Sequence, residues 1–200
     1  MKPRYLGLHF KSVRQRAPKF VRRSTMCSDD RVYVFRCPNV LRTGSTAALS
    51  ALMIEWFEDL VLGTRFKSAE KVVTREDIKR FAREFDPQPY HLDEVAAERT
   101  ALGGLAASGW HTAAIAMRLA TDLRPFGPHP LLGIGVDELR WLAPVRPGDV
   151  LHLEGEVIEL KPSKNKPHGI VKVKWTAFNQ RGEPVYTFTP IGIVPRRPPS

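Results

Sequence analysis

The segment from Ser108 to Asp122 is rich in alanine, and its first charged residue after Gly109 is Arg118. A helix over this segment is apolar on nearly every face, so other parts of the chain must surround it. Its small alanines also allow other backbone to approach closely. The chain therefore needs a second layer of structure that can wrap around one helix.

The last third of the chain supplies that layer as four strand-like segments, residues 133–142, 150–160, 169–179 and 183–194. In the second and third of them apolar residues alternate with polar ones, so each strand has one dry face. Turn sequences at 147–149 and 180–183 favour an antiparallel arrangement, and Pro190 indicates a bulge or an edge. An antiparallel sheet and an apolar helix can bury each other, which predicts an α+β fold with the sheet wrapped around one long helix.

The residues before the apolar helix predict a strand over 65–73 and two further helices. Thr74 and Asp77 form a TxxD capping signal for a helix that ends at Asp86. Asp93 then caps a short helix to Arg99, and two glycines at 103–104 end it.

The net charge of +10 is concentrated near the N-terminus. Residues 1–52 hold 11 Lys and Arg against two acidic residues, whereas residues 53–200 hold 20 against 19. A nearly neutral folded part has no electrostatic footprint for phosphate backbones, so we expect no nucleic-acid binding. Residues 1–52 are expected to be a mostly disordered basic extension: a transit-like leader, or a segment outside the native protein if translation starts at Met53.

The remaining composition is that of an ordinary globular protein. No apolar run approaches the roughly 20 residues that span a bilayer, so no membrane association is expected. The two cysteines, Cys27 and Cys37, form neither a CxxC pair nor part of a His cluster, so we expect no metal site. We expect a cytoplasmic protein with reduced thiols.

The segment Asp86-Pro87-Gln88-Pro89-Tyr90-His91 sets a carboxylate and an imidazole five residues apart between two predicted helices. Two prolines fix backbone φ angles there, which would hold an acid and a base at one distance. A structural role is the alternative, because Asp before Pro is an ordinary helix stop and a single His is commonly structural. Spacing alone does not decide between them.

Three segments beyond Met53 resemble the MaoC-like dehydratases, the family that contains the (R)-specific enoyl-CoA hydratases. They read FEDLVLGTRF from Phe57, FDPQPYHLD from Phe85, and PVRPGD from Pro144. The resemblance implies a single hot-dog domain over residues 53–200. In that family the middle segment reads DxNPxHxD, and its catalytic Asp and His correspond to Asp86 and His91.

The resemblance implies a hydro-lyase that hydrates or dehydrates an enoyl thioester, with Asp86 and His91 activating water. The main-chain N–H of Gly109 is the expected oxyanion donor. The substrate carrier is CoA or an acyl carrier protein, with no further cofactor. The residues expected to line the substrate pocket are Gln88, Tyr90, Ser108, Trp110 and His111.

This chain departs from the family pattern at two places. Gln88 stands where the family has Asn, and Ser108-Gly109-Trp110 stands where many members begin the central helix with His-Gly. Trp110 either shortens the acyl pocket or packs in the core. Lys164 and Lys166, with Arg146, could meet CoA phosphates, but ordinary surface charge explains them better.

Two other functions of the folded domain remain open, a hot-dog thioesterase and a non-catalytic acyl-thioester-binding partner subunit. Nucleic-acid binding through the basic residues 1–52 is a third alternative and ranks last. The resemblance also implies a homodimer or a dimer of dimers, an arrangement that hides the edge strands of the sheet.

Overall fold

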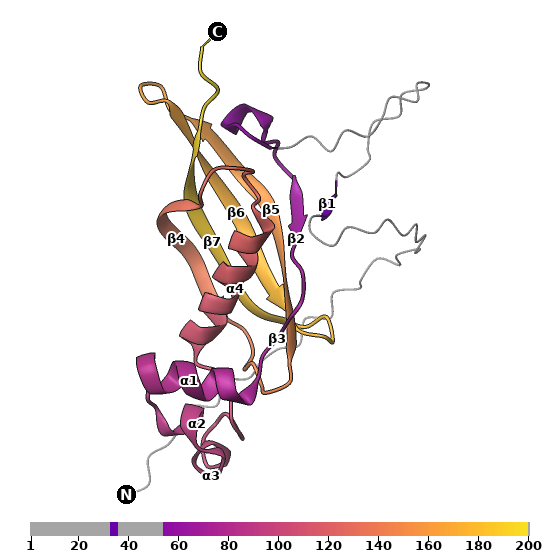
Figure 1. Cartoon of the computed structure of the whole chain (residues 1–200), viewed down its shortest axis with the longest axis vertical. Helices are drawn as coiled ribbons and strands as arrows, with labels where there is room; N and C mark the ends of the chain where they lie inside the picture. The colour runs from indigo at the N-terminus through magenta and orange to yellow at the C-terminus, as the bar shows by residue number, and fades with distance from the viewer. Residues whose placement is uncertain (1–32, 36–53, 200) are drawn as a thin grey trace, which may run out of the picture. The chain divides into compact units, whose positions relative to one another are not determined.

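The structure is a computed structural model that describes residues 33–35 and 54–199 of the chain (Figure 1). Four long strands dominate it: β4 (Leu132–Trp141), β5 (Val150–Pro162), β6 (His168–Phe178) and β7 (Pro184–Pro195). They form an antiparallel sheet in the order β5-β6-β7-β4, and the helix α4 (Gly109–Leu123) lies along one face of it (Figure 1). The predicted α+β architecture is confirmed.

The alternating patterns predicted for β5 and β6 hold in the structure. Leu151, Leu153 and Val157 of β5 are buried, and the polar residues that alternate with them, at 152, 154 and 156, are half-buried. On β6, the buried residues are Val171, Val173, Trp175 and Ala177. Because successive side chains of a strand point to opposite faces, one face of this sheet is dry and the other meets solvent.

Three short strands extend the sheet on the β5 side. β2 (Arg65–Lys67) and β3 (Lys71–Val72) both pair with β5, so the single strand predicted over 65–73 is divided in two. β1 (Tyr33–Phe35) pairs antiparallel with β2. The rest of residues 1–52 lies outside the described residues, and the disorder predicted there stays a prediction.

Pro190 lies in an internal strand and not at an edge, because β7 has β6 on one side and β4 on the other. Beside Pro190 the pairing of β7 with β6 is interrupted: Lys172 pairs with Ile191, and the next pair is Trp175 with Phe188. A proline has no N–H to donate to a ladder, which accounts for the irregularity.

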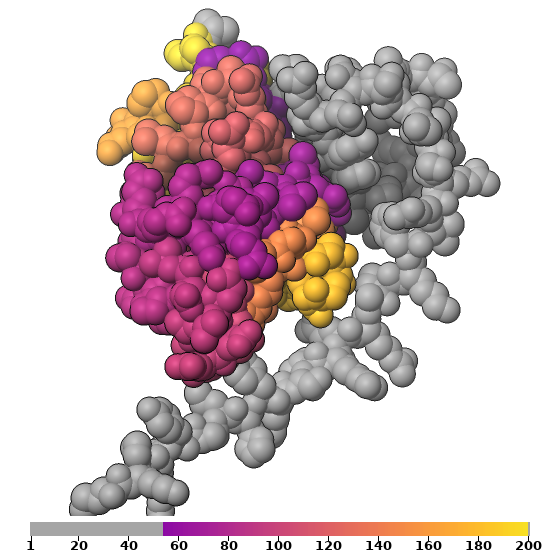
Figure 2. Space-filling view, turned by 60° about the horizontal axis from the view of Figure 1, so that its bottom comes forward, coloured from indigo at the N-terminus to yellow at the C-terminus, as the bar shows by residue number. Residues whose placement is uncertain are grey.

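Four short helical segments precede α4: a 3-10 turn η1 (Phe57–Asp59), α1 (Arg75–Phe85), α2 (Pro89–Leu92) and α3 (Glu94–Glu98). The capping signals act as predicted, since Thr74 accepts the Asp77 N–H and Asp93 accepts the Ala96 N–H. The helices α1 to α3 gather at the N-terminal end of α4 (Figure 1) and form a continuous surface there (Figure 2). None of the helices in the described ranges is both long and apolar enough to cross a bilayer.

The sheet covers only one side of α4 within a single chain. Ile115, Leu119 and Leu123 pack into the core beneath it. On the other side Ala114 is exposed, and the side chain of Met117 is 46% exposed. The sequence predicted that α4 is surrounded on all sides, but a single chain covers only one side of it.

Candidate active site

The carboxylate of Asp86 lies at the point where α1 ends. The Asp86 N–H donates to Ala82 O, which closes the last turn, and the following Pro87 cannot continue the helix. This leaves the side chain free to reach across to α4, where the Ser108 hydroxyl donates to Asp86 Oδ2 at 2.6 Å. One carboxylate oxygen is thus held by a fully buried serine.

The imidazole of His91 comes from the short helix α2, which was not predicted and lies between the two predicted helices. Pro89 begins this four-residue helix, and the His91 N–H donates to Gln88 O at 3.0 Å. The His91 ring is buried, and its Nδ1 lies 2.8 Å from Ala106 O. Since a carbonyl oxygen only accepts, Nδ1 carries a proton, and in the neutral imidazole the lone pair lies on Nε2.

That free nitrogen faces the carboxylate. His91 Nε2 lies 3.5 Å from Asp86 Oδ2, which is longer than an ordinary hydrogen bond. The sequence prediction that these two side chains converge is met by this geometry. Two acceptors at this distance can share one small donor, such as a water molecule.

The N-terminus of α4 adjoins the pair. Ser108 is the N-cap, and its side chain accepts the Trp110 N–H. The Gly109 N–H makes no hydrogen bond within the described part of the chain, as is usual in the first turn of a helix. The Gly109 carbonyl accepts a hydrogen bond from Trp141 Nε1 at 2.8 Å, and a Cβ atom on Gly109 would lie 2.7 Å from that indole.

These groups line one cavity of about 660 Å³. Asp86, His91 and Ser108 form its polar part, while the loop at 100–107 and the segment 141–145 supply mostly apolar walls. The described residues contain no cluster of three or more His, Cys, Asp or Glu that could hold a metal ion.

Comparisons with known proteins show the family of this chain. Residues 58–178 match the MaoC like domain. The chain belongs to the MaoC-like dehydratase family.

Two solved structures and one curated relative illustrate the likeness. The MaoC-like dehydratase from Rhodospirillum rubrum is 49% identical, covers 72% of this chain and 99% of its own, and superposes with a TM-score of 0.67. The unliganded R-hydratase PhaJ1 from Pseudomonas aeruginosa is 28% identical over 71% of this chain and 86% of its own, with a TM-score of 0.58. The 3-hydroxybutyryl-CoA dehydratase of Methylorubrum extorquens is 35% identical over 120 residues, 59% of this chain and 73% of that protein. The hot-dog fold is thereby confirmed.

The other pocket residues predicted from the MaoC-like pattern divide into two groups. Tyr90, Ser108 and Trp110 line the cavity. Gln88 and His111 do not line it in this chain: Gln88 is exposed at the start of α2, and the His111 ring stacks on Phe81 at 4.8 Å. His111 is turned toward α1, and burial lowers the pKa of its imidazole.

Sequence reasoning missed two contributors to this MaoC-like site. Trp141 lines the cavity and holds the Gly109 carbonyl, and the Ala106 carbonyl holds His91. A tryptophan at the end of a predicted strand is a weak signal, since aromatic residues are common in cores. A main-chain acceptor leaves no signal at all, because every residue carries one.

Proposed function

We propose that this protein is a hydro-lyase that adds water to, or removes it from, the 2,3 double bond of an enoyl thioester. The observation that carries the proposal is the convergence of Asp86 Oδ2 and the free His91 Nε2 on one cavity beside the Gly109 N–H. The relatives named as hydratase and dehydratase support the reaction type.

The pair is suited to holding a water molecule. Oδ2 and Nε2 both accept, so a water between them donates one hydrogen to each and keeps an oxygen lone pair for C3 of the substrate. In hydration the water oxygen bonds to C3, the pair takes one water proton, and a proton is delivered to C2. One water is consumed and no redox partner is needed.

The Gly109 N–H serves the other half of the reaction. As the oxygen bonds to C3, negative charge develops on the thioester oxygen. A free N–H at the first turn of α4, reinforced by the helix dipole, stabilises that charge. The space that a side chain of Gly109 would take is filled by the Trp141 indole, which packs against this first turn of the helix.

The same cavity suits an acyl thioester carried by CoA or by an acyl carrier protein. Trp110 and Trp141 meet edge to face, with ring centroids 5.2 Å apart, and form an aromatic wall at the helix tip. We propose that this wall limits the length of the acyl chain. A panel of enoyl-CoA substrates of graded length tests it, and equal turnover of short and long chains would contradict it.

The decisive experiment replaces the pair in two separate variants, Asp86→Asn and His91→Gln. Each should abolish hydration of crotonyl-CoA, followed by the loss of enoyl absorbance, with the circular dichroism of the folded protein retained. Asp122→Asn and His152→Gln are matched controls away from the cavity and should retain activity. Full activity in either pair variant would refute the assignment.

The same preparation separates the two alternatives. A thioesterase would release free CoA from saturated acyl-CoA, and a non-catalytic subunit would bind crotonyl-CoA without turning it over. Hydration without CoA release supports the proposal, whereas either of the other two patterns replaces it.

We further propose that the protein is a homodimer. β4 lies at the edge of the sheet, and β7 is its only partner strand among the described elements. Its side chains Leu132, Ile134 and Val136 are more than half exposed, and Met117 is exposed on the neighbouring α4. An apolar edge strand of this length is normally covered, and a second copy of β4 would extend the sheet across the two chains.

Light scattering tests the dimer. The wild-type chain should elute at twice its monomer mass, and Val136→Lys should shift it toward monomer by placing a charge in the covered edge. Lys161→Ala, on an exposed end of β5, is a control that should keep the dimer. A wild-type monomer at micromolar concentration would contradict the proposal.

A further inference from the structure

The loop between α3 and α4, residues 99–108, carries much of the site but has little regular structure of its own. It supplies the Ala106 carbonyl that holds His91, then the Ser108 hydroxyl that holds Asp86. Gly103 and Gly104 in its middle both have positive φ angles. Consecutive glycines of this kind are conformationally free, so the loop needs support from elsewhere in the fold.

Arg146 supplies that support from the connection between β4 and β5. Its Nη1 donates to Gly104 O at 2.6 Å and to Leu105 O at 3.2 Å, and its Nη2 donates to Leu102 O. One guanidinium therefore binds three carbonyls of the loop. The main chain beside it adds a fourth contact, because the Ala107 N–H donates to Val145 O at 2.8 Å.

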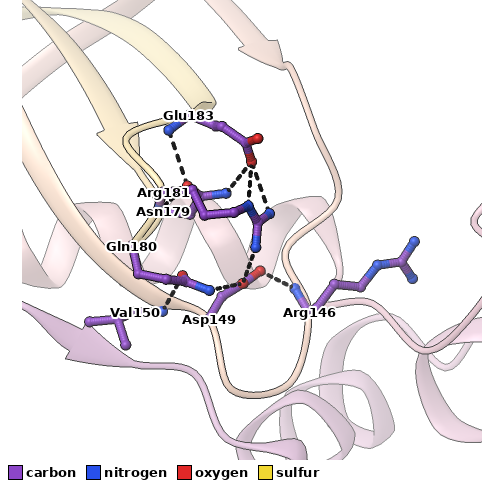
Figure 3. Close-up of polar contacts among 7 residues, drawn as sticks. All are labelled: Arg146, Asp149, Val150, Asn179, Gln180, Arg181 and Glu183. Atoms are coloured by element: carbon purple, nitrogen blue, oxygen red, sulfur yellow. Dashed lines mark hydrogen bonds and ion pairs between the residues drawn. The ribbon is translucent and has the colours of Figure 1, made fainter.

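Arg146 is itself anchored to the sheet. Its main-chain N–H donates to Asp149 Oδ2 at 2.7 Å, and Gln180 Nε2 donates to Asp149 Oδ1 at 3.0 Å. The Asp149 side chain is buried, and Arg181 lies 4.0 Å from it. Figure 3 shows this cluster with the Arg146 side chain extending away from it. The backbone of Arg146 is therefore fixed, while its guanidinium reaches the loop.

The Ala106 carbonyl lies between the contact points of Leu105 and Ala107. Because Leu105 and Ala107 are both fixed by hydrogen bonds, the residue between them has little conformational freedom, and the position of Ala106 O is set. That carbonyl accepts a hydrogen bond from the Nδ1–H of His91, so that in the neutral ring Nε2 faces Asp86 without a proton. The two terminal nitrogens of Arg146 are engaged in these contacts, which argues against its role as a phosphate ligand.

We infer that Arg146 is a positioning residue: by holding the carbonyls of residues 102–105 it places Ala106 O, and through that carbonyl it selects the tautomer of His91. The effect on turnover rests on the proposed hydro-lyase function. The effect on the tautomer does not depend on that function, because it is a property of the protein without substrate.

The experiment measures the tautomer of His91 and the turnover of the enzyme. Arg146→Met keeps the length of the side chain and removes its donors, Arg146→Lys keeps a cation with a different donor geometry, and Arg65→Met removes an arginine from an exposed ion pair with Glu156. Nitrogen-15 spectra of histidine-labelled protein report which ring nitrogen is protonated, and His91→Gln identifies the His91 signals. Crotonyl-CoA kinetics give kcat and KM separately.

Wild type and Arg65→Met should show His91 protonated on Nδ1 only. Arg146→Met should show a mixture with the Nε2-protonated form and a kcat lower by roughly 10- to 100-fold, the size expected when a reacting group is misplaced by about 1 Å. KM should change less than kcat, and Arg146→Lys should lie between Arg146→Met and wild type in both readouts.

An unchanged His91 tautomer in folded Arg146→Met overturns the inference, whatever the activity. If Arg146→Met does not fold, the same comparison is made on Arg146→Lys, where a wild-type tautomer and a wild-type kcat together overturn it. A changed tautomer with unchanged kcat also overturns it, because positioning would then not serve turnover. If wild type itself lacks hydratase activity, the proposed function fails, and the spectra alone decide whether Arg146 positions His91.

Discussion

The two ends of α4 have contrasting surroundings. Toward its C-terminus, Ile115, Leu119 and Leu123 pack against the dry face of the sheet through apolar contacts alone. At its N-terminus, Ser108 binds Asp86 at the end of α1 and Gly109 binds Trp141 of β4, and His91 lines the same cavity. Burial of apolar surface provides stability, whereas directed hydrogen bonds provide chemistry. Changes at the packed end should therefore cost stability, and changes at the polar end should cost turnover.

The largest expected effect is in the apolar core that packs against α4. Leu153 on β5 belongs to the same core cluster as Ile115 and Leu119, with 0% exposure. Leu153→Ala should lower the free energy of unfolding by about 2–5 kcal/mol, because it loses buried apolar contacts and leaves a cavity. Urea denaturation measures the loss, and kcat per folded molecule should stay at the wild-type value. Leu62 is exposed, so Leu62→Ala is the control. An equal loss of unfolding free energy in Leu62→Ala would mean that burial of Leu153 is not the cause.

The next effect is at the polar end. Ser108→Ala removes the hydroxyl that binds Asp86 Oδ2, and a hydrogen bond to a charged group contributes about 1.5–3 kcal/mol. We expect kcat to fall by roughly 10- to 100-fold, and stability to fall by about 1 kcal/mol because the helix cap is lost.

Thr74→Ala is a matched control for that prediction. Thr74 caps α1 as Ser108 caps α4, and its side chain accepts only the Asp77 N–H. It should show a similar loss of stability with little change in kcat. Equal losses of kcat in both variants would mean that Ser108 acts as a cap alone.

Gly109→Ala tests how closely the helix tip is packed. The new methyl group would collide with the Trp141 indole, and overpacking of this kind costs about 1–3 kcal/mol. We expect a less stable protein with reduced hydration, measured by urea denaturation and by crotonyl-CoA turnover. The double variant Gly109→Ala/Trp141→Ala should be more active than Gly109→Ala alone; if it is not, the collision is not the cause.

The smallest effect concerns pH and His111, which lies in the first turn of α4 and faces α1. Burial lowers the pKa of His111 in the folded protein, so the unfolded chain takes up its proton first as the pH falls. Stability should therefore be present in full above about pH 6.5, the usual histidine pKa, and decrease as the pH drops below it. His111→Leu should reduce that decrease, as measured by urea denaturation at pH 8 and pH 5.5. An identical decrease in both proteins would assign it to other groups.

Much of the fold could be predicted because its signals are local. The alternation in β5 and β6, the caps at Thr74 and Asp93, and the apolar face of α4 each depend on residues a few positions apart. The exposure of apolar residues on β4 and on one side of α4 could not be predicted from local sequence patterns. Apolar residues look alike in a sequence whether they face a sheet of the same chain or a second copy.

The candidate site also combines contacts between residues that are close in the sequence and contacts between residues that are distant. Asp86 and His91 are five residues apart, so their approach could be predicted from one segment. Arg146 and Gly104 are 42 residues apart, and the acceptor is a carbonyl that no side chain identifies.

The amino-acid sequence by itself determined the class of fold, the family and the segment that brings Asp86 and His91 together, because periodicity, caps and short motifs act over a few residues. Only the tertiary structure decided which carbonyl orients His91, which indole closes the tip of α4 and which arginine holds the loop. Those contacts join segments that are distant in the chain, and they depend on main-chain atoms that every residue shares.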